Sequence, residues 1–356
     1  MNEKNRKFKK RIAVTGGAGF IGSNLLLMMV PHYPDYLFVN IDCLTYAANL
    51  SNLSEIDSAE NYKFEKIDIT DFASLGQCFD KYNFDSVIHL AAESHVDRSL
   101  IGPALFIQTN VMGTFNLLEL ARKSAATNSN FRFHHVSTDE VYGSIEAGSS
   151  ADEKYPVNPS SPYAASKAAA DQLVRSYHKS YGLNIVITNC SNNYGPFQFP
   201  EKLIPLLINN VINGKAMPVY GDGRNIRDWI YVDDHCKALD LVFHNGKAGS
   251  AYNIGSGFET ENIFLIRKVC AILERKTGGG PYEHLIELVK DRPGHDRRYA
   301  VNSSKIKSEI GWEPSLSLDK GLELTVEWYL SQTDWLKNCT SGEYAKYYET
   351  VYGNRK

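Results

Sequence analysis

No stretch of this chain approaches the run of about twenty apolar residues that a membrane-spanning helix requires. None of the six cysteines has the Cys-x-x-Cys spacing of a zinc site, and their scatter suggests no disulfide framework. The formal net charge of −3 gives no sign of nucleic-acid binding. The basic start, from Lys4 to Arg11, lacks the apolar region of a signal peptide. We therefore expect a soluble, cytoplasmic protein with no metal, membrane or nucleic-acid partner.

Alternating strand-like and helix-like segments make up the first half of the chain. The strand candidates are residues 11–15, 36–41, 62–67, 85–91, 131–137 and 184–190, and the helix candidates are residues 20–30, 71–81, 103–126 and 161–181. This alternation predicts an α/β fold with a Rossmann-like, doubly wound parallel sheet, which binds ligands at the carboxyl ends of its strands. With 43% apolar residues, the 356-residue chain can form one or two interlocked domains.

A glycine-rich turn follows the first predicted strand and precedes an apolar helix. Gly16, Gly19 and Gly22 have the spacing GxxGxxG, a variant of the dinucleotide-binding fingerprint. These glycines permit a tight turn, close approach of the backbone to a pyrophosphate, and close packing of the helix on the strand. Asp42 ends the next strand, about twenty residues after Gly22, where a carboxylate binds ribose hydroxyls and repels a 2′-phosphate. The pattern predicts a bound dinucleotide and favours NAD over NADP.

After Cys190 the alternation becomes irregular. Residues 204–212 suggest an amphipathic helix, residues 219–227 a glycine-rich loop, and residues 229–243 a return to the first domain. We assign residues 1–190, rejoined by about 229–255, to an NAD-binding domain, and residues 191–228 and 256–356 to a smaller mixed α/β domain that binds substrate. Five basic residues in loops of the second part could hold a diphosphate, because arginine donates two parallel hydrogen bonds to phosphate: Lys202, Arg227, Arg292, Arg297 and Arg298.

The most informative stretch joins Thr138, Asp139 and Glu140 to the pair Tyr163 and Lys167. Tyr163 and Lys167 are four residues apart and share one helix face, so the ammonium can favour the phenolate and make it a base. A simple dehydrogenase needs one proton transfer per hydride transfer, and two extra carboxylates suggest further chemistry. An isolated Tyr-xxx-Lys also occurs by chance, and an Asp-Glu pair after Ser-Thr can be a helix cap or a solvated loop.

The candidate site residues coincide with the ends of predicted strands, which a structural role alone does not explain. These ends carry Asp42, then Asp68 and Ile69, then residues 90–94, residues 138–140, and Asn192 with Asn193. Because the carboxyl ends of parallel strands meet at one edge of the sheet, we expect these residues to lie close together.

Several longer motifs resemble one enzyme family, the dTDP-glucose 4,6-dehydratases, which are extended short-chain dehydrogenase/reductase enzymes. The motifs are TGGAGFIGS, DCLTYAANL, HLAAESHVDRS, HVSTDEVYG, YAASKAAAD, TNCSNNYGPFQFPEKLIP, RDWIYVDDH and DRPGHDRRYA, and the resemblance runs from about residue 11 to about residue 330. Related sugar-nucleotide 4-epimerases keep the glycine loop and the Tyr/Lys pair but generally lack the Asp-Glu pair after Thr. The departures are small: Ala48 stands where glycine is usual, and Asn302 where aspartate often stands.

The resemblance implies a role for each matching position. Cofactor would be bound by Gly16, Gly19, Phe20, Ile21, Gly22, Asp42, Cys43, Leu44, Thr45, Asp68, Ile69, Leu90, Ala91, Ala92, Ser94, Thr109, Tyr163, Lys167 and Asn193. Substrate would be bound by Ser94, Thr138, Asn192, Lys202, Leu203, Pro218, Val219, Tyr220, Arg227, Asn262, Asp291, Arg292, Pro293, Gly294 and His295. The predicted helices 103–126 and 161–181 would pair with those of a second copy in a homodimer.

In such an enzyme Tyr163 takes the proton of the sugar 4-hydroxyl while hydride passes to NAD. The resulting ketone acidifies the hydrogen at carbon 5, which Glu140 removes, while protonated Asp139 releases the 6-hydroxyl as water. Hydride then returns to carbon 6, and the product is dTDP-4-keto-6-deoxyglucose. The residues leave open a UDP-glucose 4,6-dehydratase, a sugar-nucleotide 4-epimerase, which the Asp-Glu pair argues against, and a non-catalytic NAD-binding regulator.

Overall fold

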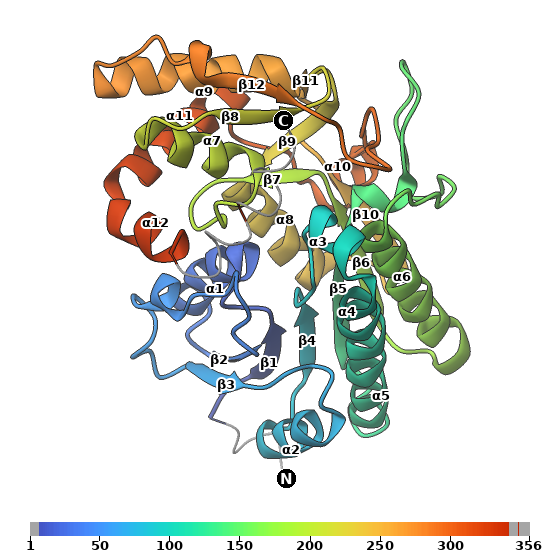
Figure 1. Cartoon of the computed structure of the whole chain (residues 1–356). Helices are drawn as coiled ribbons and strands as arrows, with labels where there is room; N and C mark the ends of the chain where they lie inside the picture. The colour runs from blue at the N-terminus through green and yellow to red at the C-terminus, as the bar shows by residue number, and fades with distance from the viewer. Residues whose placement is uncertain (1–6, 342–347, 349–356) are drawn as a thin grey trace.

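A seven-stranded parallel sheet forms the centre of the molecule, as a computed structural model of residues 7–341 and Tyr348 shows (Figure 1). Its strand order is β10-β6-β5-β4-β1-β2-β3. The strands are β1 (Lys10–Thr15), β2 (Tyr36–Asp42), β3 (Tyr62–Lys66), β4 (Ser86–His89), β5 (Arg132–Thr138), β6 (Ile185–Cys190) and β10 (Ser250–Ile254). The order reverses beside β1, which is the topological switch point of a doubly wound sheet. The predicted Rossmann-like fold is confirmed; Lys4 and Arg6 of the basic start lie outside the described residues.

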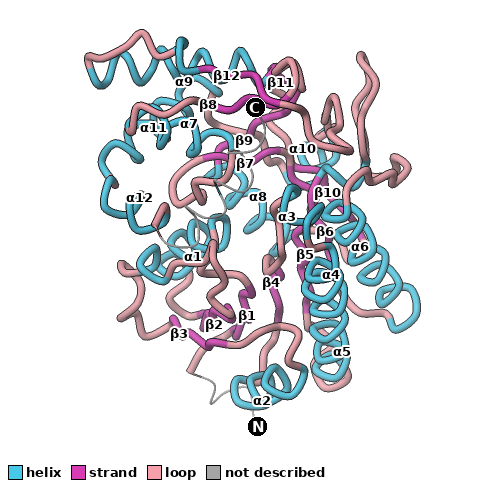
Figure 2. The backbone as a smooth tube through the Cα atoms, viewed as in Figure 1, coloured by secondary structure: helices cyan, strands magenta, loops and turns pink. Residues whose placement is uncertain are grey.

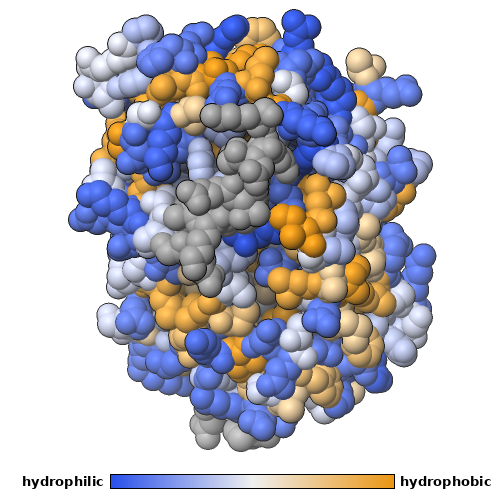
Figure 3. All heavy atoms as spheres, viewed as in Figure 1, coloured by the Kyte–Doolittle hydropathy of each residue, from blue (hydrophilic) through white to orange (hydrophobic). Residues whose placement is uncertain are grey.

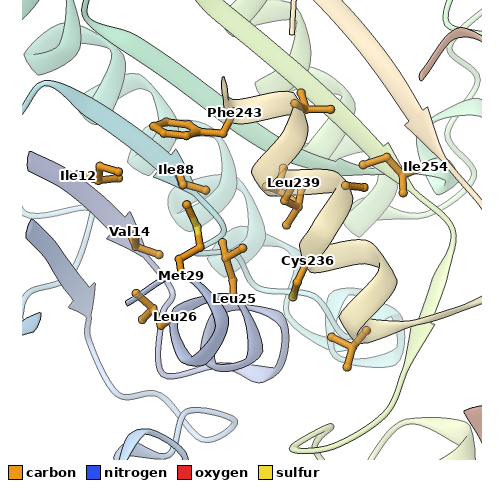
Figure 4. Packing of buried hydrophobic residues seen from close by; sticks show 14 of the residues in the cluster. Ile12, Val14, Leu25, Leu26, Met29, Ile88, Cys236, Leu239, Phe243 and Ile254 are labelled. Carbon is orange, nitrogen blue, oxygen red and sulfur yellow. The ribbon is translucent and has the colours of Figure 1, made fainter. Parts of the chain in front are cut away.

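Helices cover both faces of this sheet because its buried strands are apolar on both sides. On one face, α1 (Phe20–His32) and α8 (Val232–Asn245) pack against side chains such as Ile12, Val14 and Ile88 (Figure 4). On the other face, α2 (Phe72–Tyr82), α5 (Thr114–Ala125) and α6 (Pro162–Tyr181) share a second apolar cluster with the alternate strand residues. Two separate apolar cores therefore hold the strand ends in fixed positions.

The start and end of α6 follow from local sequence. Ser161 caps the helix by accepting a hydrogen bond from the Ala164 N–H at 3.1 Å, and Pro162 occupies the first turn. Gly182 ends the helix with a φ of 68°, a left-handed conformation that glycine adopts without strain. Tyr163 and Lys167 are consequently fixed in the first turns of a long, well-anchored helix.

The segment predicted as a single helix over residues 103–126 is divided. It comprises α4 (Pro103–Phe106), a π-helical stretch (Ile107–Gly113) and α5, and the short α3 (Val96–Ile101) precedes it. Within the stretch, the Asn110 side chain hydrogen-bonds the Glu93 backbone at 2.9 and 3.0 Å and the Ser166 hydroxyl at 2.8 Å. Such wide turns frequently occur at functional sites, and this one carries Thr109.

A smaller layer of mixed structure lies over the carboxyl ends of the large sheet (Figures 1 and 2). It contains short sheets formed by β7 (Asn192–Tyr194), β9 (Ile226–Tyr231) and β11 (Glu259–Glu261), and by β8 (Met217–Tyr220) and β12 (Ile286–Val289). Around them lie α7 (Leu203–Ile212), α9 (Asn262–Thr277), α11 (Leu318–Ser331) and α12 (Thr333–Cys339), whereas α10 (Ser304–Ile310) packs on α8 and β10 of the larger part. A third apolar cluster, with Leu207, Trp229 and Leu322, forms the core of the smaller layer. In the described part of the chain, no helix combines the length and apolar character needed to cross a membrane.

Candidate active site

A cavity of about 400 Å³ lies at the carboxyl ends of the central strands and brings together most of the predicted site residues. The predicted residues that line it are Gly16, Gly19, Phe20, Ile21, Gly22, Asp42, Cys43, Thr45, Asp68, Ile69, Leu90, Ala91, Ala92, Ser94, Thr109, Thr138, Asp139, Glu140, Tyr163, Lys167, Asn192, Asn193 and Lys202. The cavity is therefore continuous from the glycine-rich turn to the first turns of α6. Its extent suits an elongated ligand such as a dinucleotide.

Backbone packing explains why the turn after β1 needs glycine. Gly16 has a φ of 72°, and a Cβ there would lie 2.7 Å from the Ala91 Cα. A Cβ on Gly22 would lie 2.2 Å from the Gly16 carbonyl oxygen, so α1 could not pack this closely on the turn. Phe20 and Ile21 begin α1 and line the cavity beside the turn. The N-terminus of α1 can thus attract the negative charge of a pyrophosphate.

Asp42 is held in place at the end of β2. Its carboxylate accepts hydrogen bonds from the Ala18 N–H at 3.0 Å and the Leu44 N–H at 2.8 Å. Burial raises the pKa of this carboxyl, while the two backbone hydrogen bonds oppose that rise. Leu44 contributes its N–H but lies outside the cavity lining. The fixed carboxylate on the cavity wall fits the ribose hydroxyls of NAD and disfavours an additional phosphate.

Thr138, Asp139 and Glu140 lie where β5 runs into a short 3₁₀ helix (Asp139–Tyr142). The Thr138 hydroxyl accepts a hydrogen bond from the Glu140 N–H at 3.3 Å and donates one to Asp139 Oδ1 at 3.3 Å. The segment is therefore a helix cap as well as part of the cavity wall. Burial, followed by the charge of Glu140, raises the pKa of Asp139 well above its usual range. The two neighbouring carboxyls differ in environment, and Asp139 is held in its neutral, acidic form.

Tyr163 and Lys167 project from α6 into the same cavity. Burial raises the pKa of Tyr163, Glu140 raises it further, and a hydrogen bond with Thr138 opposes the rise. Burial also lowers the pKa of Lys167, whose Nζ donates to the Val136 carbonyl oxygen at 2.9 Å. Burial therefore favours the neutral phenol of Tyr163, and the prediction that the Lys167 ammonium favours its phenolate stays a prediction.

The remaining predicted substrate residues lie outside the lining of this cavity, in the smaller layer above it. They are Leu203 at the start of α7, Pro218, Val219 and Tyr220 on β8, Arg227 on β9, Asn262 at the start of α9, and Asp291, Arg292, Pro293, Gly294 and His295 in the loop after β12. The charge of Glu140 nevertheless acts on Lys202, Arg227 and Arg292. Three cations are therefore close enough to the catalytic end of the cavity to bind an anionic substrate there.

All five candidate phosphate-binding residues have partners, but only Arg297 and Arg298 each form two short contacts with one carboxylate. Lys202 donates to the Ser94 carbonyl oxygen at 2.8 Å, Arg227 donates to backbone carbonyl oxygens, and Arg292 lies 3.6 Å from Asp97. Arg297 pairs with Asp222 at 2.8 and 3.1 Å, and Arg298 pairs with Glu259 at 2.6 and 2.8 Å. These ion pairs brace the loop after β12 against β9 and its neighbours. The prediction that Arg297 and Arg298 are available for a diphosphate is thus not supported by their contacts.

Sequence reasoning missed two residues near the centre of the site. The Tyr299 hydroxyl donates to Asp296 at 2.8 Å and lies 3.5 Å from Glu140 Oε2. Glu201 lines the cavity and accepts hydrogen bonds from Tyr46 at 2.8 Å and Arg98 at 3.1 Å. Both stand inside motifs noted above, DRPGHDRRYA and FPEKLIP, but their contacts depend on distant segments. Among residues 7–341, no cluster of His, Cys, Asp and Glu side chains has the arrangement of a metal site.

Comparisons with known proteins agree with this geometry. A family model described as GDP-mannose 4,6 dehydratase matches residues 13–325. The chain is 48% identical to a dTDP-glucose 4,6-dehydratase of Salmonella typhimurium, over 97% of this chain and all of that protein. It is 50% identical to one of Haemophilus influenzae, over 90% of this chain and 97% of the relative. A solved dTDP-glucose 4,6-dehydratase from Streptomyces venezuelae with NAD bound superimposes with a TM-score of 0.85 at 44% identity, covering 92% of this chain and 99% of that structure.

Proposed function

The chain belongs to the dTDP-glucose 4,6-dehydratase family, and from this premise we propose that it is an NAD-dependent hydro-lyase converting dTDP-glucose to dTDP-4-keto-6-deoxyglucose. The observation that carries the proposal is the placement of Asp139 and Glu140 in one cavity with Tyr163. Two carboxyls beside the tyrosine supply the acid and base that removal of water requires, and a 4-epimerase has no use for them.

The residues of the cavity fit NAD. The glycines of the first turn allow its backbone to pack closely against the Ala91 backbone and the start of α1, and Asp42 offers carboxylate oxygens to a ribose. The buried side-chain oxygen of Asn193, beside Tyr163 and Lys167 in the cavity, has no protein partner. NAD would be held by these groups, and when bound it supplies a hydride acceptor and donor together with the positive charge of its nicotinamide ring.

The chain's own residues account for the proton transfers. As a phenolate, Tyr163 removes the proton of the 4-hydroxyl and becomes a neutral phenol; the hydrogen bond with Thr138 favours the phenolate before this step. Once carbon 4 is a ketone, Glu140 removes the hydrogen at carbon 5. Asp139, neutral because it is buried, protonates the departing 6-hydroxyl. Burial favours the protonated form that Asp139 needs as an acid, whereas it disfavours the phenolate that Tyr163 needs as a base.

Proton balance gives Thr138 a second task. Each turnover leaves one proton on Tyr163 and removes one from Asp139, while Glu140 returns its proton to carbon 5. Thr138 is hydrogen-bonded to both Tyr163 and Asp139. Its hydroxyl can therefore pass the excess proton from the phenol to the carboxylate and reset the site.

Substrate binding belongs to the smaller layer over the cavity. We assign residues 1–190, with about 229–255, to NAD binding, and residues 191–228 and 256–356 to the nucleotide sugar. In support, β10 joins the seven-stranded sheet beside β6, whereas β7, β8 and β9 form separate sheets. Lys202, Arg227 and Arg292 would face the diphosphate. Arg227 is buried and the other two are partly buried, which strengthens their attraction for it.

A homodimer and a cytoplasmic location complete the proposal. Apolar side chains on the helices around α5 are exposed in the single chain: Ile107 by 48%, Met112 by 48% and Tyr181 by 58%. Figure 3 shows apolar atoms gathered over the region of α3 and α4 on the same side of the molecule. A second copy of the chain would cover this surface.

The test is incubation with dTDP-glucose, UDP-glucose and GDP-mannose in parallel, followed by mass spectrometry of the nucleotide sugars. We expect loss of one water molecule from dTDP-glucose at a much higher rate than from the other two. Preferential dehydration of another nucleotide sugar would contradict the substrate assignment. A product that retains all its oxygens would point to epimerisation.

A further inference from the structure

His89 ends β4, immediately before residues 90–94, which line the cavity. Its side chain is 1% exposed, and none of the proton transfers described above uses it. Thr15, the last residue of β1, and Thr114, the first residue of α5, are fully buried and contact its two ring nitrogens. Polar side chains from three elements therefore meet directly next to the wall of the cavity.

The direction of each hydrogen bond at His89 follows from the number of hydrogens available. The Thr114 hydroxyl donates its one hydrogen to the Asn110 carbonyl oxygen at 2.6 Å, so it can only accept from His89 Nε2, at 2.9 Å. A neutral imidazole that donates from Nε2 accepts at Nδ1, where the Thr15 hydroxyl lies at 2.7 Å. Burial favours this neutral ring, because it lowers the pKa of His89 well below the usual range. The contacts thus specify the tautomer that carries its hydrogen on Nε2.

Thr15 connects the ring to the loop that follows β4. Its hydroxyl oxygen also accepts a hydrogen bond from the Ala91 N–H at 3.2 Å. Ala91 lines the cavity, and its backbone packs so closely on Gly16 that a Cβ there would lie 2.7 Å from the Ala91 Cα. Because the Thr15 hydrogen is directed at His89, the lone pairs of the hydroxyl remain available to Ala91. His89 thereby fixes how the loop after β4 approaches the glycine-rich turn.

The other side of the ring is connected to the first turn of α6. Asn110, which accepts from Thr114, donates from its side-chain amide to the Ser166 hydroxyl at 2.8 Å. That hydroxyl donates in turn to the Tyr163 carbonyl oxygen at 2.7 Å. Every polar side-chain atom in this series has a hydrogen-bond partner. A continuous path of buried contacts therefore runs from the loop after β4 to the start of α6.

We propose that His89 is a positioning residue for NAD: its neutral imidazole bridges Thr15 and Thr114 and so holds residues 90–94 against the glycine-rich turn. The role requires one acceptor and one donor at fixed points of a rigid, uncharged ring, and the imidazole provides both. A charged ring would have no acceptor for the Thr15 hydrogen. The inference concerns the binding of NAD and does not rest on the dehydration of dTDP-glucose.

Asparagine and glutamine separate the two hydrogen bonds of the ring. The amide oxygen of asparagine can lie near the position of Nδ1, so His89→Asn keeps an acceptor for Thr15. The amide of glutamine reaches the position of Nε2, so His89→Gln keeps a donor for Thr114 and leaves the Thr15 hydroxyl without its acceptor. Exchange of bound NAD for isotopically labelled NAD should be about tenfold faster in His89→Gln, as expected for the loss of one buried hydrogen bond. In His89→Asn it should stay close to the wild-type rate.

His134→Gln is the matched control. His134 is a fully buried histidine on the neighbouring strand β5 that hydrogen-bonds Thr188 at 3.1 Å and does not line the cavity. Its substitution should leave the rate of NAD exchange unchanged. Equal acceleration in folded His89→Asn and His89→Gln, or in the control, would reveal a general packing effect and overturn the proposal. A wild-type rate in folded His89→Gln would also overturn it.

Nuclear magnetic resonance of the NAD-bound protein with nitrogen-15 histidine tests the tautomer without a change at His89. Nδ1 should show the chemical shift of an unprotonated nitrogen, and Nε2 that of a nitrogen bearing hydrogen. Thr15→Val removes the hydroxyl and keeps the shape of the side chain, so it should identify the signal by moving the Nδ1 resonance. It should also speed NAD exchange, whereas Thr15→Ser should keep the wild-type values of both.

These measurements decide the question even if the His89 variants do not fold. A protonated Nδ1 in the wild-type protein, or wild-type NAD exchange in folded Thr15→Val, would overturn the role of His89. If the protein fails to dehydrate dTDP-glucose but the tautomer and the exchange rates are as expected, the proposed function is wrong and the role of His89 stands.

Discussion

Replacing Asp139 with asparagine should abolish dehydration while leaving the protein as stable as before, or more stable at neutral pH. Asp139 is 3% exposed, and its Oδ2 has no hydrogen-bond partner in the described structure. Asparagine keeps the shape of the neutral acid and an oxygen that can accept from Thr138. It cannot give a proton to the departing hydroxyl. The variant therefore separates the chemical role of Asp139 from its structural role.

The expected loss of activity follows from general acid catalysis, which typically contributes about 10²–10⁴ in rate. That range corresponds to about 2.7–5.4 kcal/mol of lost transition-state stabilisation. Oxidation at carbon 4 does not use this proton, so the variant should still accumulate enzyme-bound NADH when dTDP-glucose is added. Stopped-flow absorbance at 340 nm and mass analysis of the product measure the two steps separately.

The stability effect depends on pH with a definite sign. The folded-state pKa of Asp139 is raised, so the native protein binds this proton more tightly than the unfolded chain. In the wild type, stability falls as pH rises above the unfolded pKa, by about 1.4 kcal/mol per unit until the folded pKa is reached. The asparagine side chain does not titrate, so the variant does not lose stability between the two pKa values of Asp139. The unfolding free energy of Asp139→Asn should therefore exceed that of the wild type by more as the pH rises through this range.

Asp80→Asn, at an exposed position on α2, is the matched control and should change neither activity nor the pH dependence of stability. Wild-type dehydration by Asp139→Asn would refute its role as the acid. The difference in unfolding free energy between Asp139→Asn and the wild type should favour the variant more at pH 7 than at pH 4. A difference that favours the variant less at pH 7 would refute the claim that Asp139 is buried in neutral form.

Four further predictions follow from the same geometry. Tyr163→Phe should prevent formation of enzyme-bound NADH on addition of dTDP-glucose, and a normal 340 nm signal would contradict its assignment as the first base. Glu140→Gln should lower kcat by at least about 10² while that signal persists; product formation at the wild-type rate would exclude Glu140 as the carbon 5 base. Gly22→Ala should abolish NAD binding or folding, because its Cβ would lie 2.2 Å from the Gly16 carbonyl oxygen, and retained affinity in calorimetry would show that the turn can open. Met112→Lys should yield monomers in light scattering of the eluting protein, and an intact dimer would place the interface elsewhere.

Regular features of the chain made most of the fold predictable. Strand-like and helix-like segments alternate up to Cys190, and this alternation, with the glycine-rich turn, predicted six strands of the large sheet. Most of the predicted strand ends lie within one or two residues of the observed ends. The division of the helix over residues 103–126 was not predictable, because the π-helical stretch accommodates contacts of Asn110 with Glu93 and Ser166. Those contacts exist only after distant segments have packed.

Site residues next to the carboxyl ends of strands could be predicted from the sequence. Site residues in the loops of the smaller layer were harder to predict. Asp42, Thr138 and Tyr163 line one cavity, as the edge of a parallel sheet requires. The position of Tyr299 beside Glu140 depends on the fold of the smaller layer. The high pKa of Tyr163 was also beyond the sequence, because the opposed effects of burial and of the Thr138 hydrogen bond depend on how deeply the side chain lies in the folded protein.

Isotope transfer tests the central claim most directly, because it follows the reacting hydrogens through one turnover. Substrate dTDP-glucose carrying deuterium at carbon 4 should give a product with that deuterium in its new methyl group at carbon 6. Unlabelled substrate turned over in heavy water should gain deuterium at carbon 5, where a carboxylate exchanges its proton with solvent. Nuclear magnetic resonance and mass spectrometry of the product locate both labels. Return of the label to carbon 4 with the 6-hydroxyl intact, or its loss to water, would contradict the account.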